Sequence, residues 1–299
     1  MSGRPLADHD QVATVRRFNR SVTQRVGALH DDYLSRDRPL GESRLLWEIG
    51  PSGQDVRSLR SRLDLDAAYV SRLLRSLESD GLVVVEPAPA DRRVRVARLT
   101  RRGLAERRLL DRRSDELAGS ILEPLGERQR EELTVAMARV EQLLTASMVQ
   151  VTVRDPRDPT ARACVQAYYD ELAARFDAGF DPARSISATE AELTPPAGLL
   201  LVATLHGDPI GCGAVKLHGR RPAELKRMWV APTARGLGVG RRLLVELEDH
   251  ARQRGARTVR LETNRSLTEA IALYRSSGYR EVPAFNDEPY AHHWFEKRV

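Results

Sequence analysis

Apolar residues in the first half of the chain recur at the spacing of α-helices, interrupted once by two short strand-like runs. The pattern predicts helices over residues 9–36, 41–49, 56–63, 67–79, 102–122 and 126–145. Asp66 is a good N-cap for the fourth helix. Residues 82–86 and 94–99 predict a hairpin with a polar tip. Because the third and fourth helices are joined by a short turn and followed by this hairpin, we expect a winged helix-turn-helix after a frayed N-terminal tail.

The second half alternates strand-like and helical runs. We expect strands over 147–154, 198–205, 210–217, 224–230, 258–263, 281–285 and 292–297. Helices are expected over 160–176, 241–253 and 267–276, and a polar loop over 177–196. This order predicts an α+β domain. Two domains, residues 1–145 and 147–299, follow from the change of pattern and agree with a length of 299 residues.

The net charge is +6, and the basic residues are almost all arginine. Ten arginines and three acids fall between Asp91 and Arg113, which makes a local positive patch at the predicted hairpin. Cys164 and Cys212 are too few for a disulfide framework. With no signal peptide or long apolar run, we expect a cytoplasmic protein without membrane contact. The spacing of Cys and His residues predicts no metal site.

Three glycines stand at the junction between the expected strand 224–230 and the helix that follows it. Gly236, Gly238 and Gly240 lack a Cβ, so backbone N–H groups there can converge on a bulky anion at a helix N-terminus. The spacing is not the dinucleotide fingerprint, and no Gly-Lys-Ser/Thr follows it. A pyrophosphate is therefore the predicted ligand.

The run Arg235-Gly236-Leu237-Gly238-Val239-Gly240 resembles Arg/Gln-x-x-Gly-x-Gly/Ala, the acyl-CoA loop of GNAT acetyltransferases. The resemblance covers the chain after about Met148. It implies a mixed, mostly antiparallel sheet and transfer of an acetyl group from acetyl-CoA to a small primary amine. The residues it implies for acetyl-CoA binding are Met228, Trp229, Val230, Arg235, Gly236, Leu237, Gly238, Val239, Gly240, Arg241 and Asn264.

The GNAT resemblance also implies catalytic and acceptor-binding residues. Tyr274 takes the position of the tyrosine that protonates the departing thiolate. Glu224 is the favoured general base, with Glu262 as its competitor, and we expect burial to raise the pKa of such a base. Candidates for binding the amine acceptor are Asn286, Glu288 and Tyr290.

The wing region resembles a second family. Asp91, Arg93, Leu99, Thr100 and Gly103 fit the Asp-x-Arg-x5-Leu-Thr-x-x-Gly signature of MarR-type regulators. This resemblance implies a homodimer on double-stranded DNA with an inverted repeat. The expected DNA-binding residues are Tyr69, Ser71, Arg72, Arg75, Arg93 and Arg95.

We therefore expect a fused regulator and N-acetyltransferase. Two alternatives stay open at this point. The GNAT domain could merely sense acyl-CoA for a DNA-binding regulator, or it could acetylate lysines of DNA-bound proteins.

Overall fold

A computed structural model describes residues 8–27, 34 and 38–299. The chain divides into two compact units, residues 1–135 and 136–299. The helix α6 (Glu127–Met148) runs through this division. The predicted domain limits of 145 and 147 stay a prediction.

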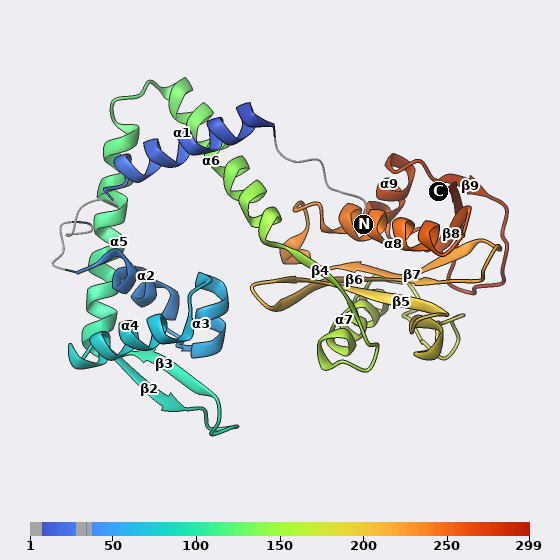
Figure 1. The fold of residues 1–299 in the computed structure, drawn as a ribbon, viewed down its shortest axis with the longest axis horizontal. Coiled ribbons are helices and arrows are strands. Elements are labelled where there is room, and N and C mark those ends of the chain that lie inside the picture. The colour runs from blue at the N-terminus through green and yellow to red at the C-terminus, as the bar shows by residue number, and fades with distance from the viewer. Residues whose placement is uncertain (1–7, 28–33, 35–37) are drawn as a thin grey trace. The chain divides into compact units, whose positions relative to one another are not determined.

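The first unit is mainly helical (Figure 1). Its elements are α1 (His9–Arg25), α2 (Leu40–Ile49), β1 (Gln54–Asp55), α3 (Val56–Leu63), α4 (Ala67–Ser79), β2 (Val83–Pro87), β3 (Arg95–Leu99), α5 (Arg101–Leu122) and the start of α6. The expected winged helix-turn-helix is present as α3, α4 and the β2–β3 hairpin. The expected helix over 9–36 ends at Arg25. The predicted tail before residue 8 and most of 28–37 lie outside the described residues.

Side-chain caps start the two central helices of this unit. Asp55 accepts a hydrogen bond from Ser58 N at the start of α3, and Asp66 accepts one from Tyr69 N at the start of α4, each at 2.9 Å. One face of α4 is buried in the core, through Val70, Leu73, Leu74 and Leu77. The opposite face of α4 is therefore left for solvent or a ligand.

Thr100 and Gly103 join the wing to α5. The Thr100 hydroxyl donates to the Gly81 carbonyl at 2.7 Å and accepts from Gly103 N at 3.1 Å, so it caps α5 and ties it to the start of β2. A Cβ on Gly103 would lie 2.0 Å from the Leu82 carbonyl oxygen. The Leu-Thr-x-x-Gly part of the sequence signature is thus explained by a cap and a close backbone contact.

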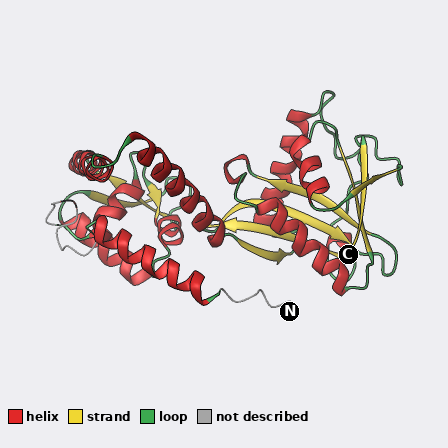
Figure 2. Ribbon diagram, turned by 90° about the horizontal axis from the view of Figure 1, so that it is seen from above, coloured by secondary structure: helices red, strands yellow, loops and turns green. Residues whose placement is uncertain are grey.

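The second unit is α+β, as expected. Its elements are β4 (Gln150–Arg154), α7 (Pro159–Arg175), η2 (Ala191–Leu193), β5 (Gly198–Leu205), β6 (Asp208–Lys216), β7 (Ala223–Val230), η3 (Pro232–Ala234), α8 (Val239–Gln253), β8 (Thr258–Thr263), α9 (Thr268–Ser276), β9 (Arg280–Val282) and β10 (His293–Arg298). Figure 2 shows the strands as one twisted sheet with helices packed on it.

The sheet has the order β4-β5-β6-β7-β8-β10-β9, and only the β7–β8 pair is parallel. Helix α7 covers one face, against Leu200, Val202 and Cys212. Helices α8 and α9 cover the other face (Figure 1), where Leu243 and Leu247 of α8 lie in the larger core. Both cysteines are buried and free. Among the described residues no helix is long and apolar enough to cross a membrane.

Replacing Gly103 with alanine should destabilise the first unit by about 1–3 kcal/mol, because the new methyl group overlaps the Leu82 carbonyl and the backbone must shift. Amide hydrogen exchange of core peptides from α4 and α5 measures the unfolding free energy of this unit by itself.

Gly119 provides the matched control on the same helix. A Cβ there meets no atom within 4 Å, so Gly119→Ala should stabilise α5 by roughly 0.5–1 kcal/mol through helix propensity. Equal exchange rates in the two variants would contradict the role given to the Gly103–Leu82 contact.

Candidate functional site

The parallel strands β7 and β8 diverge soon after they begin. Only Ala223 and Glu224 of β7 pair with β8, opposite Val259 and Arg260. A bulge follows at Arg227, whose φ of 58° lies in the left-handed region. Beyond it, Met228 packs with the α8 side of the sheet, whereas Trp229 packs with the α7 side. The divergence opens the sheet at its centre and leaves one edge of β7 unpaired.

The glycine-rich turn predicted from the sequence follows β7 and starts α8. Gly236 and Gly238 have φ values of 84° and 75°, which only glycine adopts without strain. Gly238 is the N-cap of α8 and supplies no side-chain hydrogen bond. The first amides of α8 are therefore free to bind an anion, and the positive end of the helix dipole favours one.

A cavity of about 470 Å³ extends from this turn along β7 to α9. It collects nearly all the predicted cofactor residues: Met228, Trp229, Val230, Arg235, Gly236, Gly238, Val239, Gly240 and Arg241. Leu237 does not line it and faces α6 instead. Asn264 also lies elsewhere, in the neighbouring cavity, where its amide donates to the Tyr290 carbonyl at 2.7 Å.

Glu171 of α7 reaches across the large cavity to Arg235. Its Oε1 lies 2.5 Å from Arg235 Nη2 and 3.0 Å from Arg175 Nη1, and its Oε2 accepts from Trp229 Nε1 at 2.9 Å. Burial raises the pKa of Glu171, but hydrogen bonds from Arg175, Arg235 and Trp229 outweigh it, and the net pKa is lowered. Glu171 is therefore a carboxylate at neutral pH. It forms an ion pair with Arg235, the arginine expected to hold the pyrophosphate.

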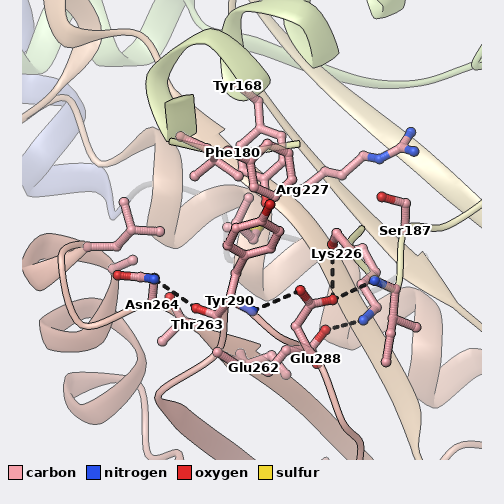
Figure 3. Close-up of a pocket in the computed structure, with 18 of the residues that line it drawn as sticks. Tyr168, Phe180, Ser187, Lys226, Arg227, Glu262, Thr263, Asn264, Glu288 and Tyr290 are labelled. Carbon is pink, nitrogen blue, oxygen red and sulfur yellow. Dashed lines mark hydrogen bonds and ion pairs between the residues drawn. The ribbon is translucent and has the colours of Figure 1, made fainter. Parts of the chain in front are cut away.

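A smaller cavity of about 90 Å³ lies between β7, β8, α7 and the loop before η2. Figure 3 shows Glu288 and Tyr290 beside it. Glu288 is buried and accepts hydrogen bonds from Ile186 N at 2.6 Å, Ser185 Oγ at 2.9 Å and Tyr290 N at 3.3 Å. No cation pairs with it among the residues that the structure describes. Asn286, the third predicted acceptor residue, does not line this cavity and accepts from Trp294 Nε1.

Tyr274 lines both cavities. Its side chain is buried, its hydroxyl makes no hydrogen bond to any described residue, and burial followed by the nearby charge of Glu262 raises its pKa. The hydroxyl therefore stays protonated at neutral pH. It is placed to donate a proton where the two cavities meet.

The two candidate bases differ in their surroundings. Glu224 lines neither cavity and holds Arg260 at 2.6 Å, with His218 Nε2 at 3.6 Å. Burial raises the pKa of Glu224, but the Arg260 hydrogen bond and the charge of Lys226 overcome it. The expected raised pKa is thus wrong for Glu224, because burial here brings two cations with it.

Glu262 lines the smaller cavity. One oxygen, Oε1, forms an ion pair with Lys226 Nζ. The other oxygen, Oε2, is buried and has no hydrogen-bond partner in the described part of the chain. Glu262 therefore lies at the cavity with one carboxylate oxygen that has no described partner.

Sequence reasoning missed much of the lining of the smaller cavity. Four aromatic residues from α7 and the loop after it line this cavity: Tyr168, Tyr169, Phe176 and Phe180. The Phe180 ring lies 4.9 Å from the Tyr290 ring and 5.6 Å from that of Tyr169. Aromatic residues make up only 5% of the chain, so four of them within thirteen residues was a signal in the sequence that could have indicated this cavity.

The predicted DNA-binding residues lie on α4 and the wing. Ser71, Arg72 and Arg75 are exposed, whereas Tyr69 is half-buried with Arg72 stacked 5.5 Å from its ring centre. Arg93 is 91% exposed at the wing tip, and Asp91 accepts hydrogen bonds from its backbone N–H and its guanidinium. Arg95, on β3, is exposed as well. In the described residues no cluster of His, Cys, Asp and Glu is suited to a metal ion.

Comparison with known proteins agrees with this geometry. A family model described as the acetyltransferase (GNAT) family matches residues 165–279, and a MarR family model matches residues 37–94. An IAA acetyltransferase of Azospirillum brasilense is 43% identical over 94 residues, which are 31% of this chain and 61% of the relative. The N-alpha-acetyltransferase RimI of Mycobacterium tuberculosis is 34% identical over 46% of this chain and 84% of its own length.

Solved structures also align with part of the chain. A GNAT-family acetyltransferase from Staphylococcus aureus aligns with 50% of this chain and 99% of its own, at 15% identity and a TM-score of 0.44. The chain spans 61% of the length of the Azospirillum relative, which is less than two thirds, and 84% of the length of the RimI protein. On the family models and the RimI relative, the chain belongs to the GNAT acetyltransferase family and carries a MarR-family winged helix ahead of that domain.

Proposed function

We propose that the second unit transfers the acetyl group of acetyl-CoA to the primary amine of a small acceptor, and that the first unit binds DNA as a regulator. The observation that carries the enzymatic half is the meeting of two unequal cavities at Tyr274. The larger cavity has the glycine-rich turn, residues 235–240, at one end, and this turn is called the anion turn below. The smaller cavity is lined by aromatic rings and buried carboxylates.

The larger cavity suits the cofactor. The glycine turn and the start of α8 offer backbone N–H groups to the diphosphate, and Arg235 and Arg241 add positive charge. The unpaired edge of β7 beyond the bulge offers peptide groups to the amide-bearing arm of the cofactor. Glu171 must release Arg235, at least in part, for the diphosphate to gain that arginine.

The smaller cavity suits an amine. A buried carboxylate without a cation, Glu288, favours a positively charged acceptor, and the surrounding rings favour one as well. A volume of about 90 Å³ admits a small amine or the end of a longer one.

The reaction needs no covalent intermediate. The neutral amine attacks the thioester carbonyl, a C–N bond forms and the C–S bond breaks. Before the attack, the bound ammonium gives one proton to Glu262 and becomes the neutral amine. The departing thiolate takes the proton of the Tyr274 hydroxyl, and the proton lost by the acylated nitrogen restores that hydroxyl. We propose Glu262 rather than Glu224 for the base because only Glu262 lines the cavity.

A regulator that only senses acyl-CoA is the second candidate. It is favoured by the Lys226–Glu262 ion pair, because Lys226 already occupies one oxygen of the carboxylate proposed as the base. Release of free thiol from acetyl-CoA across a panel of primary amines separates the two. Turnover with any amine supports the enzyme, whereas cofactor binding without turnover supports the sensor.

The DNA-binding half rests on α4 and the wing. The exposed arginines of α4 and Arg93 give a positive surface suited to a DNA groove and its phosphates. Helix α1 also carries an exposed apolar stripe: Val12, Val15, Phe18 and Val22, each 37–56% exposed. A second copy of the chain would bury this stripe, which supports a homodimer on an inverted repeat.

Tyr274→Phe should lower kcat by about 100-fold or more while leaving the affinity for coenzyme A within about twofold, because only the proton donor is lost. Steady-state thiol release and calorimetric titration measure the two quantities. Tyr279→Phe is the matched control, since Tyr279 is also buried but lines neither cavity. A Tyr274→Phe enzyme with unchanged kcat would remove the acid role.

Glu262→Gln should lower kcat/KM by about 100-fold, whereas Glu224→Gln should lower it by less than about fivefold. The reason is that Glu262 lines the cavity and has one oxygen without a described partner, whereas Glu224 lines neither cavity and is held by Arg260. Both variants need unchanged coenzyme A affinity as a test of folding. The reverse order of effects would return the base role to Glu224.

Arg93→Ala should weaken binding of a labelled DNA duplex and reduce the slope of log affinity against log salt by about one, as for one lost phosphate contact. Fluorescence anisotropy across a salt series measures both quantities. Arg128→Ala is the control, because Arg128 is 90% exposed, is paired with Glu132 and lies on α6. Equal effects of the two substitutions would mean that the wing makes no specific contact.

A further inference from the structure

The second half of α6 contacts the anion turn directly. Gln142 Nε2 donates a hydrogen bond to the Gly236 carbonyl at 3.0 Å, and both residues belong to the second unit. Arg139 lies one helical turn before Gln142, and its Nη1 donates a hydrogen bond to Gln142 Oε1 at 2.5 Å. The turn expected to hold the diphosphate is thus fixed from outside by a helix of the N-terminal half of the sequence.

The hydrogen bond controls the direction of a carbonyl group. Gly236 has no Cβ and a φ of 84°, so the peptide that follows it is easily rotated. A carbonyl oxygen turned towards the cofactor cavity would repel a diphosphate. Gln142 does not line that cavity, so its bond holds the oxygen on the α6 side. Gln142 therefore favours the form of the turn that accepts an anion.

Helix α6 has few other contacts to hold it. None of its residues is buried, and its large apolar side chains, such as Val135, Met137, Leu143 and Leu144, are 50–64% exposed. An open cavity of about 550 Å³ separates it from Arg235 and Leu237. Just after the helix, the Val149 carbonyl accepts from Arg242 Nη1 at 2.6 Å. The position of this helix therefore depends on a small number of polar contacts, one of which is to the turn.

We propose that Gln142 is a positioning residue that couples acyl-CoA occupancy of the turn to helix α6, and through α6 to the first unit. This inference rests on the proposed cofactor site. An anion that fixes the Gly236 peptide strengthens the Gln142 bond, and the bond in turn favours the anion, because coupling between two sites is reciprocal. Helix formation is cooperative, so anchoring one end of α6 lowers the fraying of the whole helix, including the residues before Ala136.

Amide hydrogen exchange of the full chain with and without coenzyme A tests this coupling. In the native protein, coenzyme A should slow exchange in the turn, residues 233–242, and also slow exchange in residues 127–135 of α6 by about fivefold or more. In Gln142→Ala, the turn should still be protected at saturating coenzyme A, but residues 127–135 should no longer respond. The affinity of this variant for coenzyme A should fall by roughly two- to tenfold, as expected for one lost hydrogen bond.

Glu131→Ala is the matched control on α6, because Glu131 is exposed and lies away from the turn. It should respond to coenzyme A as the native chain does. Alanine is the best helix former, so a lost response in Gln142→Ala does not come from a weaker helix. Protection of the turn without any effect on residues 127–135, or an unchanged response in Gln142→Ala, would overturn the coupling. Protection of neither segment would overturn the proposed cofactor site itself.

Discussion

The second unit depends on a parallel strand pairing that stops almost as soon as it starts. In a sheet that is otherwise antiparallel, β7 and β8 stay together for Ala223 and Glu224 only. The bulge at Arg227 shifts the side chains of β7 by one position, so that Met228 lies on the same side of the sheet as Leu225 and Trp229 lies on the α7 side. Residues of β7 beyond its paired stretch line both cavities.

Charges inside the opened sheet are neutralised by partners that resemble the proposed ligands. Glu171 lies against Arg235 in the way that a phosphate oxygen would, and Lys226 lies against Glu262 as an ammonium group would. A buried charge left without a partner is costly, so such pairs stabilise these charged groups. The same pairs compete with the ligands for the binding groups. In the proposed function, a diphosphate or an amine therefore exchanges one ion pair for another.

Local rules made the anion turn and the wing readable from the sequence. Gly236 and Gly238, singled out for their lack of a Cβ, adopt left-handed backbone, and Thr100 of the wing signature caps α5 beside Gly103. The acceptor side was less readable. Asn286 was expected to bind the acceptor, but its side chain accepts a hydrogen bond from Trp294. The position of Glu262 in the sheet is set by the pairing of β8 with β10, two strands that are distant in sequence. Which residues meet across a bulged and separating pair of strands depends on three-dimensional register, and local periodicity carries no information about it.

The pKa of Glu224 illustrates the same limit. A glutamate on a central strand is expected to be desolvated, and desolvation by itself raises the pKa of a carboxyl group. In this chain, the next strand places Arg260 directly beside Glu224, in the second of the two registered pairs that the strands share. The hydrogen bond and charge outweigh burial and lower the pKa. The strand pairing that ends here therefore has two consequences: it places Arg260 beside Glu224, and beyond its end Glu262 lines the smaller cavity.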